Sequence, residues 1–155
     1  MGDFTHFDSA GNAIMVDVSG KEITARTAIA QGCISMNDEA MKAVLKGTAK
    51  KGDVLGAARI AGIMAAKKCA DLIPLCHPLN FDKCTIDFFI DENKKEINCT
   101  CEVKLSAKTG AEMEALTGVS VALLTVYDMC KALDKTMVIG NIKVKEKTGG
   151  KSGSY

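Results

Sequence analysis

Residues 96–105 alternate strictly between polar and apolar side chains, and this alternation constrains the fold more than any other feature of the chain. Successive side chains of a strand point to opposite faces, so the segment predicts a strand with one face in the core and the other in solvent. A polar turn at 91–94 separates it from a second predicted strand at 81–90. The two segments therefore predict an antiparallel hairpin.

Helical and strand patterns alternate around this hairpin. We expect a strand at 23–36, a helix that begins at Asn37 and stops at Gly47, a helix at 53–71, a helix at 111–133 and a last strand at 137–144. The order strand, helices, strand, strand, helix, strand predicts an α+β domain of the ferredoxin-like, split βαβ type. Its antiparallel sheet should carry the helices on one face.

The length of 155 residues fits a single domain over residues 1–155. Residues 1–21 have no sustained period and predict an irregular N-terminal arm, whereas the Gly-rich residues 147–155 predict a flexible C-terminal tail. Arms of this kind often become ordered only against a ligand or a partner. We expect both to order over a bound substrate.

Charge and cysteine usage exclude several classes of function. Twenty Lys and Arg residues against nineteen Asp and Glu give a net charge of +1, so generic nucleic-acid binding is disfavoured and an anion site must come from clustered cations. Seven cysteines without C-x-x-C spacing predict neither disulfides nor a zinc site, and we expect no bound metal. No apolar run reaches the roughly 18 residues of a membrane span. We expect a soluble, cytoplasmic protein without a membrane partner.

Both prolines of the chain flank His77, at Pro74 and Pro78. Each proline fixes its own φ and restricts the preceding residue, so His77 should lie in a stiff loop directly after a helix. Such a loop also positions backbone amides, and Leu75 and Cys76 are candidates for main-chain contacts with a ligand. The alternative is a rigid helix-to-strand connection with a buried imidazole.

Charged residues on the last predicted helix form two groups. Asp128 and Lys131 are three residues apart and share a helical face, as a catalytic pair or as an exposed ion pair. Glu112 and Glu114 occupy the first turn, where the helix dipole alone explains acidic residues.

Other cations lie at turns, tails and helix ends, several of them beside glycines, and are candidate anion ligands or solvated surface: Lys21, Arg26, Lys51, Lys67, Lys131, Lys147 and Lys151.

Six motifs can be compared with known families. They are KGDV at 51–54, ARIAG at 58–62, DLIPLCHPL at 71–79, TGAEMEALT at 109–117, YDMCKA at 127–132 and KTGGKSG at 147–153. In this order, with the match beginning at Met15, they resemble the cyclic pyranopterin monophosphate synthase family, the C protein of molybdenum cofactor biosynthesis. Ala111 and Gly118 depart from the family pattern, which has Val and Ala there. Gly118 inside a helix should cost up to about 1 kcal/mol relative to Ala.

The resemblance implies a lyase that converts a 3′,8-cyclised 7,8-dihydro-GTP to cyclic pyranopterin monophosphate and pyrophosphate. Asp128 would be a general acid or base, and Lys51 and Lys131 would be amines whose pKa is lowered by mutual repulsion and burial. The family is hexameric, a trimer of dimers, with sites at the dimer interface. No cofactor is expected, and whether Mg²⁺ accompanies the phosphates stays open. The triphosphate partners would be Lys21, Arg26, Lys67, His77 and Lys147, and the base and sugar partners Leu75, Cys76, His77, Glu112, Met113 and Glu114.

Two other classes of function compete with this interpretation. A non-catalytic nucleotide-sensing module is one, because ferredoxin-like domains often bind ligands without transforming them. A carboxylate among lysines, as at Asp128, favours the enzyme. Metal-dependent phosphoester hydrolysis is the other, and it would need a dense cluster of carboxylates and histidines, whereas the chain has two histidines.

Overall fold

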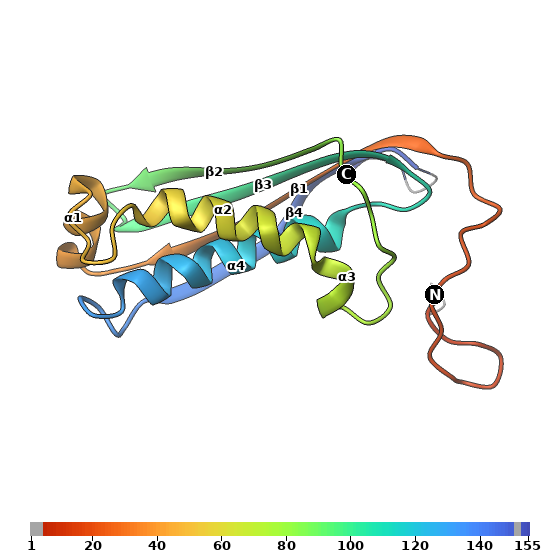
Figure 1. Cartoon of the computed structure of the whole chain (residues 1–155), viewed down its shortest axis with the longest axis horizontal. Coiled ribbons are helices and arrows are strands. Elements are labelled where there is room, and N and C mark those ends of the chain that lie inside the picture. Colours follow the sequence, from red (N-terminus) through yellow and green to blue (C-terminus); the bar gives the residue numbers. More distant parts are fainter. Residues whose placement is uncertain (1–4, 151–152) are drawn as a thin grey trace.

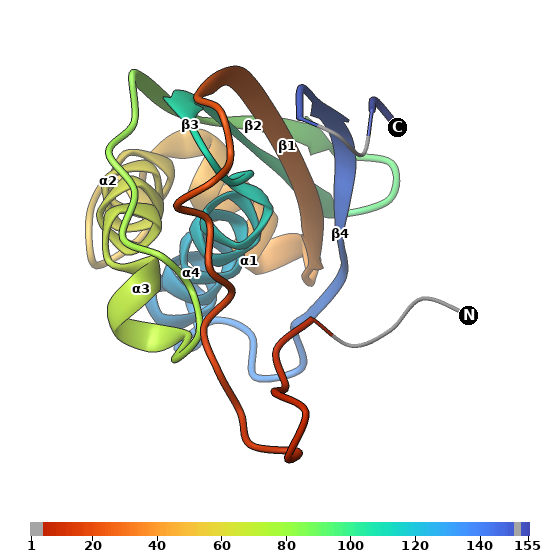
Figure 2. The same cartoon turned by 90° about the vertical axis from the view of Figure 1, so that its right-hand side faces the viewer.

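A four-stranded antiparallel sheet and a layer of helices on one of its faces make up the fold (Figure 1). The computed structural model describes residues 5–150 and 153–155. The parts of the predicted arm and tail at 1–4 and 151–152 lie outside these residues. The strand order is β2 (Lys83–Asp91), β3 (Glu96–Ala107), β1 (Thr24–Ser35) and β4 (Val138–Thr148), and the α+β, ferredoxin-like prediction is confirmed. The view along the sheet in Figure 2 shows α2 (Val54–Lys67) and α4 (Glu112–Cys130) on the same side of the strands.

The predicted hairpin forms one side of the sheet, with β2 at the edge and β3 inside. β2 (Lys83–Asp91) pairs with β3 (Glu96–Ala107), and β3 pairs with β1 (Thr24–Ser35). All five apolar residues of the alternating segment are buried, which confirms that one face of β3 forms the core.

The short helix α1 and the long helix α2 begin where the sequence predicts. α1 (Asp38–Lys46) is capped by the Asn37 side chain, which accepts a hydrogen bond from the Ala40 amide, and it ends at Gly47 in the left-handed region. α2 (Val54–Lys67) is capped by Asp53 in the same way. The predicted single helix to residue 71 is wrong at its end, because Lys68 leaves helical geometry and a separate turn, α3 (Cys69–Leu72), follows. The buried Cys69 in this turn contacts Thr117 on the next helix.

Helix α4 (Glu112–Cys130) packs against α2 through two glycines. A Cβ atom on Gly62 would lie 2.8 Å from the Gly118 carbonyl oxygen, and one on Gly118 would lie 2.8 Å from Cys101 Sγ. Gly118 therefore allows close packing between the helices and the sheet, which the helix propensity alone does not reveal. By length and composition α4 would be long and apolar enough to span a membrane, but it is the central core helix of this fold.

Strand β4 (Val138–Thr148) is longer than predicted and corrects the boundary of the tail. Lys147 is paired with Ala28 of β1, and its backbone exchanges hydrogen bonds of 2.8 and 3.2 Å with Tyr155. Two register shifts in the β1–β4 pairing accommodate the strand. Local Gly content led to the prediction of a flexible segment from 147, whereas pairing with the long edge of β1 keeps Lys147 and Thr148 in the sheet.

Candidate functional site

The antiparallel packing of α2 on α4 divides the candidate residues between two ends of the molecule. The start of α2 lies at the end of α4, and the end of α2 leads through α3 to the His77 loop beside the start of α4. Glu112 and Asp128 are separated by about 24 Å along the helix axis, at 1.5 Å per residue. We call the two regions the cavity end and the proton-transfer end.

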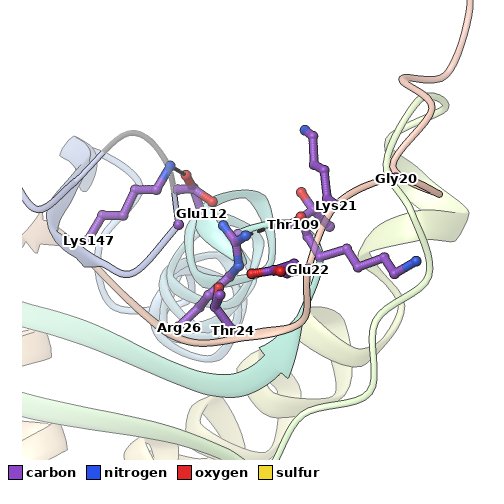
Figure 3. Close-up of a pocket in the computed structure, with 11 residues that line it drawn as sticks. Gly20, Lys21, Glu22, Thr24, Arg26, Thr109, Glu112 and Lys147 are labelled. Carbon is purple, nitrogen blue, oxygen red and sulfur yellow. Dashed lines mark hydrogen bonds and ion pairs between the residues drawn. The ribbon is translucent and has the colours of Figure 1, made fainter.

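At the cavity end, a cavity of about 590 Å³ lies between the N-terminal arm, the first residues of β1, the loop before α4 and the end of β4. We call it the anion pocket. Lys147 and Glu112 lie together on one side of it, and Lys21 reaches it from the arm on the other (Figure 3). Its charged lining residues are Lys21, Glu22, Arg26, Lys108, Glu112 and Lys147.

Arg26 and Lys147 are already held in place by neighbouring groups. Arg26 Nε donates to the Ala107 carbonyl at 3.0 Å and Nη2 donates to the Lys108 carbonyl at 3.2 Å, which leaves part of its fork of five donors for a ligand. Lys147 Nζ forms an ion pair with Glu112, and both side chains are largely buried. A bound anion would therefore compete with Glu112 for the Lys147 ammonium.

A second cavity of about 470 Å³ adjoins the anion pocket. The two share Lys21, Thr109, Gly110 and Glu112, while the second also reaches the His77 loop and Tyr155. Together they bring into one place nearly all the substrate-binding candidates, namely Lys21, Arg26, Leu75, Cys76, His77, Glu112, Met113, Glu114 and Lys147. Lys67 lines neither cavity, and it lies in the last turn of α2.

Burial shifts two side chains of the second cavity, Glu114 and Cys76, toward their neutral forms. Glu114 is only 3% exposed, and burial raises its pKa to about 7, with a smaller contribution from the charge of Glu112. Burial likewise raises the pKa of the Cys76 thiol to about 11. Near neutral pH Glu114 can thus donate as well as accept a hydrogen bond, while Cys76 remains a thiol.

At the proton-transfer end, one carboxylate lies between two ammonium groups. Asp128 Oδ2 is 2.7 Å from Lys51 Nζ, and Asp128 Oδ1 is 2.6 Å from Lys131 Nζ. Their hydrogen bonds and charges lower the pKa of Asp128 to about 2, Lys131 contributing most. We call these three residues the proton-transfer cluster.

The charge of Asp128 overturns one expectation from the sequence. The pKa of Lys131 is raised rather than lowered, because its ammonium donates to Asp128 and is attracted by that carboxylate. All three side chains are about half exposed, so this chain alone does not supply the burial that would lower the pKa of an amine.

Several lining residues were not predicted from the sequence. Lys108 precedes Thr109 and Gly110 at the entry to α4, and a cation two residues before a glycine at a helix start was the available signal. Thr24 contributes a buried hydroxyl that has no hydrogen-bond partner among the described residues. No group of three metal-ligating side chains occurs within residues 5–150 and 153–155.

Comparison with known proteins gives one consistent result. The model of the MoaC family matches residues 15–150. A protein of Clostridium botulinum named cyclic pyranopterin monophosphate synthase is 60% identical over 152 residues, covering 98% of this chain and 96% of its own length. Proteins of the same name from Novosphingobium aromaticivorans and Desulforapulum autotrophicum are 60% and 55% identical and cover the whole chain and 98% and 95% of their own lengths. The chain belongs to the MoaC family.

Proposed function

We propose that this chain converts 3′,8-cyclised 7,8-dihydro-GTP into cyclic pyranopterin monophosphate with release of pyrophosphate, as a lyase of molybdenum cofactor biosynthesis. One observation carries the proposal: in a chain with full-length relatives named cyclic pyranopterin monophosphate synthase, every candidate substrate-binding residue except Lys67 lines one of two adjoining cavities. The substrate has a polyanionic end and a polar ring system. Correspondingly, four cations line the anion pocket, whereas the His77 loop and the first turn of α4 line the second cavity.

The triphosphate is proposed to bind in the anion pocket. Four cations and two carboxylates line it, so the local charge is positive although the whole chain is nearly neutral. Lys21, Arg26 and Lys147 are the proposed ligands, with the phosphates replacing Glu112 as the partner of Lys147. Lys67 stays a predicted ligand, although it lines neither of the two cavities of the single chain.

The base and sugar are proposed to bind in the second cavity. His77 is held there by the loop between Pro74 and Pro78, and Glu112, Met113 and Glu114 approach from the first turn of α4. A Glu114 carboxyl with a pKa of about 7 can act as a donor or as an acceptor near neutral pH, which suits a ring with both donors and acceptors. Leu75 and Cys76 contribute backbone groups on the other side.

The proton transfers are assigned to Asp128, Lys51 and Lys131. One substrate cannot reach both ends of α4 in a single chain, since Asp128 lies about 24 Å from Glu112. We therefore propose that the complete site forms between two copies, with the cavities from one and the proton-transfer cluster from the other, within a hexamer built as a trimer of dimers. Cover by the second copy would also exclude water from the half-exposed lysines.

The remaining proposals concern the surroundings of the enzyme. We propose a cytoplasmic enzyme whose partners are its substrate and further copies of itself, without nucleic acid or membrane. The reaction as proposed uses no cofactor, and Mg²⁺, where it takes part, would arrive on the substrate phosphates.

Turnover of the cyclised substrate tests the proposal directly. Purified protein should release one pyrophosphate for each pterin product formed from cyclised dihydro-GTP. Binding without release of pyrophosphate would favour the nucleotide-sensing module, and release of single phosphates that depends on an added metal would favour a hydrolase. The Asp128→Asn variant is the control for contaminating activity.

A further inference from the structure

Lys108 connects two segments of the anion pocket that are 89 residues apart in the chain. Its side chain leaves the loop between β3 and α4, and its ammonium donates a 2.8 Å hydrogen bond to the backbone carbonyl of Ser19 in the N-terminal arm. The acceptor is a neutral carbonyl, so this contact fixes the lysine without cancelling its charge. The family resemblance gives Lys108 no role.

The arm forms a tight turn at the point where Lys108 binds it. The Ser19 amide donates to Asp17 Oδ1 at 2.8 Å, and the Lys21 amide donates to the Val18 carbonyl at 3.0 Å. The pKa of Asp17 is lowered mainly by the Ser19 hydrogen bonds and further by the charge of Lys108. This turn carries Gly20 and Lys21 to the wall of the anion pocket.

The loop that carries Lys108 is anchored independently of the arm. Arg26 on β1 donates to the carbonyls of Ala107 and Lys108 at 3.0 and 3.2 Å. The sheet thus fixes the loop, and the Lys108 side chain extends from a fixed point to the arm. No strand or helix lies between residue 5 and Thr24, and the hydrogen bond at Ser19 ties this irregular segment to the loop that follows β3.

We propose that Lys108 is a positioning residue that fastens the arm at Ser19, so that Lys21 faces the anion pocket before the ligand arrives. This inference rests on the proposed binding of a triphosphate in that pocket. If Lys108 did not hold the arm, ordering Lys21 on ligand binding would cost part of the binding free energy. Holding Lys21 in place beforehand lowers that cost. Lys108 then acts through Lys21 rather than as an independent phosphate ligand.

A double-mutant cycle with inorganic triphosphate tests this mechanism. Lys108→Met and Lys21→Met should each weaken binding about tenfold in calorimetry, and the double variant should be little worse than either, because both remove the same contact. Losses that multiply to about a hundredfold would make Lys108 a phosphate ligand in its own right and overturn the proposal.

Hydrogen exchange gives a readout without ligand. In Lys108→Met the amides of residues 17–21 should exchange about tenfold faster, and Lys108→Arg, which can still donate to the Ser19 carbonyl, should restore much of the protection. Lys42→Met is the matched control, because Lys42 is an exposed lysine on α1, at the other end of the sheet (Figure 1). Unchanged exchange in Lys108→Met overturns the proposal.

Kinetics separate positioning from general damage. Lys108→Met should raise KM about tenfold and leave kcat within about threefold, whereas a collapse of kcat would contradict a positioning role. If the unaltered protein binds no triphosphate, the proposed function fails at this pocket, while the exchange comparison still decides whether Lys108 fastens the arm.

Discussion

Lys51 Nζ lies 2.7 Å from Asp128 Oδ2 although the two residues are 77 positions apart in the chain. The antiparallel packing of α2 and α4 brings them together, because Lys51 precedes α2 and Asp128 lies in the last turn of α4. Lys131 completes the cluster from the following turn. Simple anion binding would gain nothing from a carboxylate between two lysines.

Asp128→Asn should abolish most turnover. The amide keeps the shape of the side chain and removes its charge and its ability to take a proton, and the loss of a positioned acid or base typically costs on the order of 10²–10⁴ in rate. Substrate affinity should stay within about tenfold, or about 1.4 kcal/mol. Pre-steady-state turnover and equilibrium binding measure the two effects, and near-normal turnover at saturating substrate would remove Asp128 from the mechanism.

Activity should be recovered by mixing two inactive variants if each site uses two copies. Asp128→Asn lacks the proton-transfer end, and Arg26→Ala lacks a cation at the cavity end. Hetero-oligomers of the two variants should contain some sites with both ends intact. A randomly mixed population of dimers should therefore reach about a quarter of normal activity. Light scattering should find a hexamer, and mixtures as inactive as their components would place the whole site in one copy.

Stability should fall as the pH rises because of Glu114. Its folded pKa of about 7 exceeds the ordinary value of 4.5, so the folded chain holds a proton that the unfolded chain has lost between these two pH values. The contribution of this proton to the free energy of unfolding is fully present below pH 4.5 and is lost as the pH rises through about 7. It amounts to about 3 kcal/mol at most. Denaturant titrations at pH 5 and pH 8 should show a smaller difference for Glu114→Gln than for the unaltered chain.

Glu39→Gln is the matched control for that titration, because Glu39 is an exposed carboxylate on α1. This control should keep the full pH dependence. An identical pH dependence in Glu114→Gln would show that burial does not keep the Glu114 proton.

Gly118→Ala should destabilise the fold despite the better helix propensity of alanine. The added Cβ atom would lie 2.8 Å from Cys101 Sγ, and overpacking of this kind costs about 1–3 kcal/mol. Thermal unfolding measures the loss. The same substitution in a Cys101→Ala background should be less costly, and an equal cost in both backgrounds would trace the effect to another contact.

The sheet could be predicted largely from local patterns, and the helical layer only in part. Strict alternation at Ile97 to Leu105 defines β3 because the period of two is a backbone property. The break at Lys68 has no proline or glycine to signal it, and it is followed by the buried Cys69, which contacts Thr117 on α4. The extension of β4 through Lys147 depends on pairing with β1, so tertiary packing overrode local composition there.

The candidate site, like the fold, could be predicted from the sequence only in part. Residue types and the family resemblance pointed to His77, Glu112 and Lys147, which line the cavities. The raised pKa of Lys131 follows from its ion pair with Asp128, whereas the expectation of a lowered pKa required a burial that a single chain does not provide. Lys108 was missed although it lies two residues before Gly110 at a helix start, and its contact with the Ser19 carbonyl has no signature in the sequence.

Helix α4 also acts as a spacer of fixed length. Each residue adds about 1.5 Å and turns the helix by about 100°. Insertion of a single residue between Glu112 and Asp128 would lengthen the span only slightly, yet it would turn the Asp128 carboxylate away from Lys51 or push the Glu112 turn away from Lys147. The two ion pairs at its opposite ends therefore require this number of residues between Glu112 and Asp128, and we expect substitutions on the helix surface to be tolerated better than insertions or deletions.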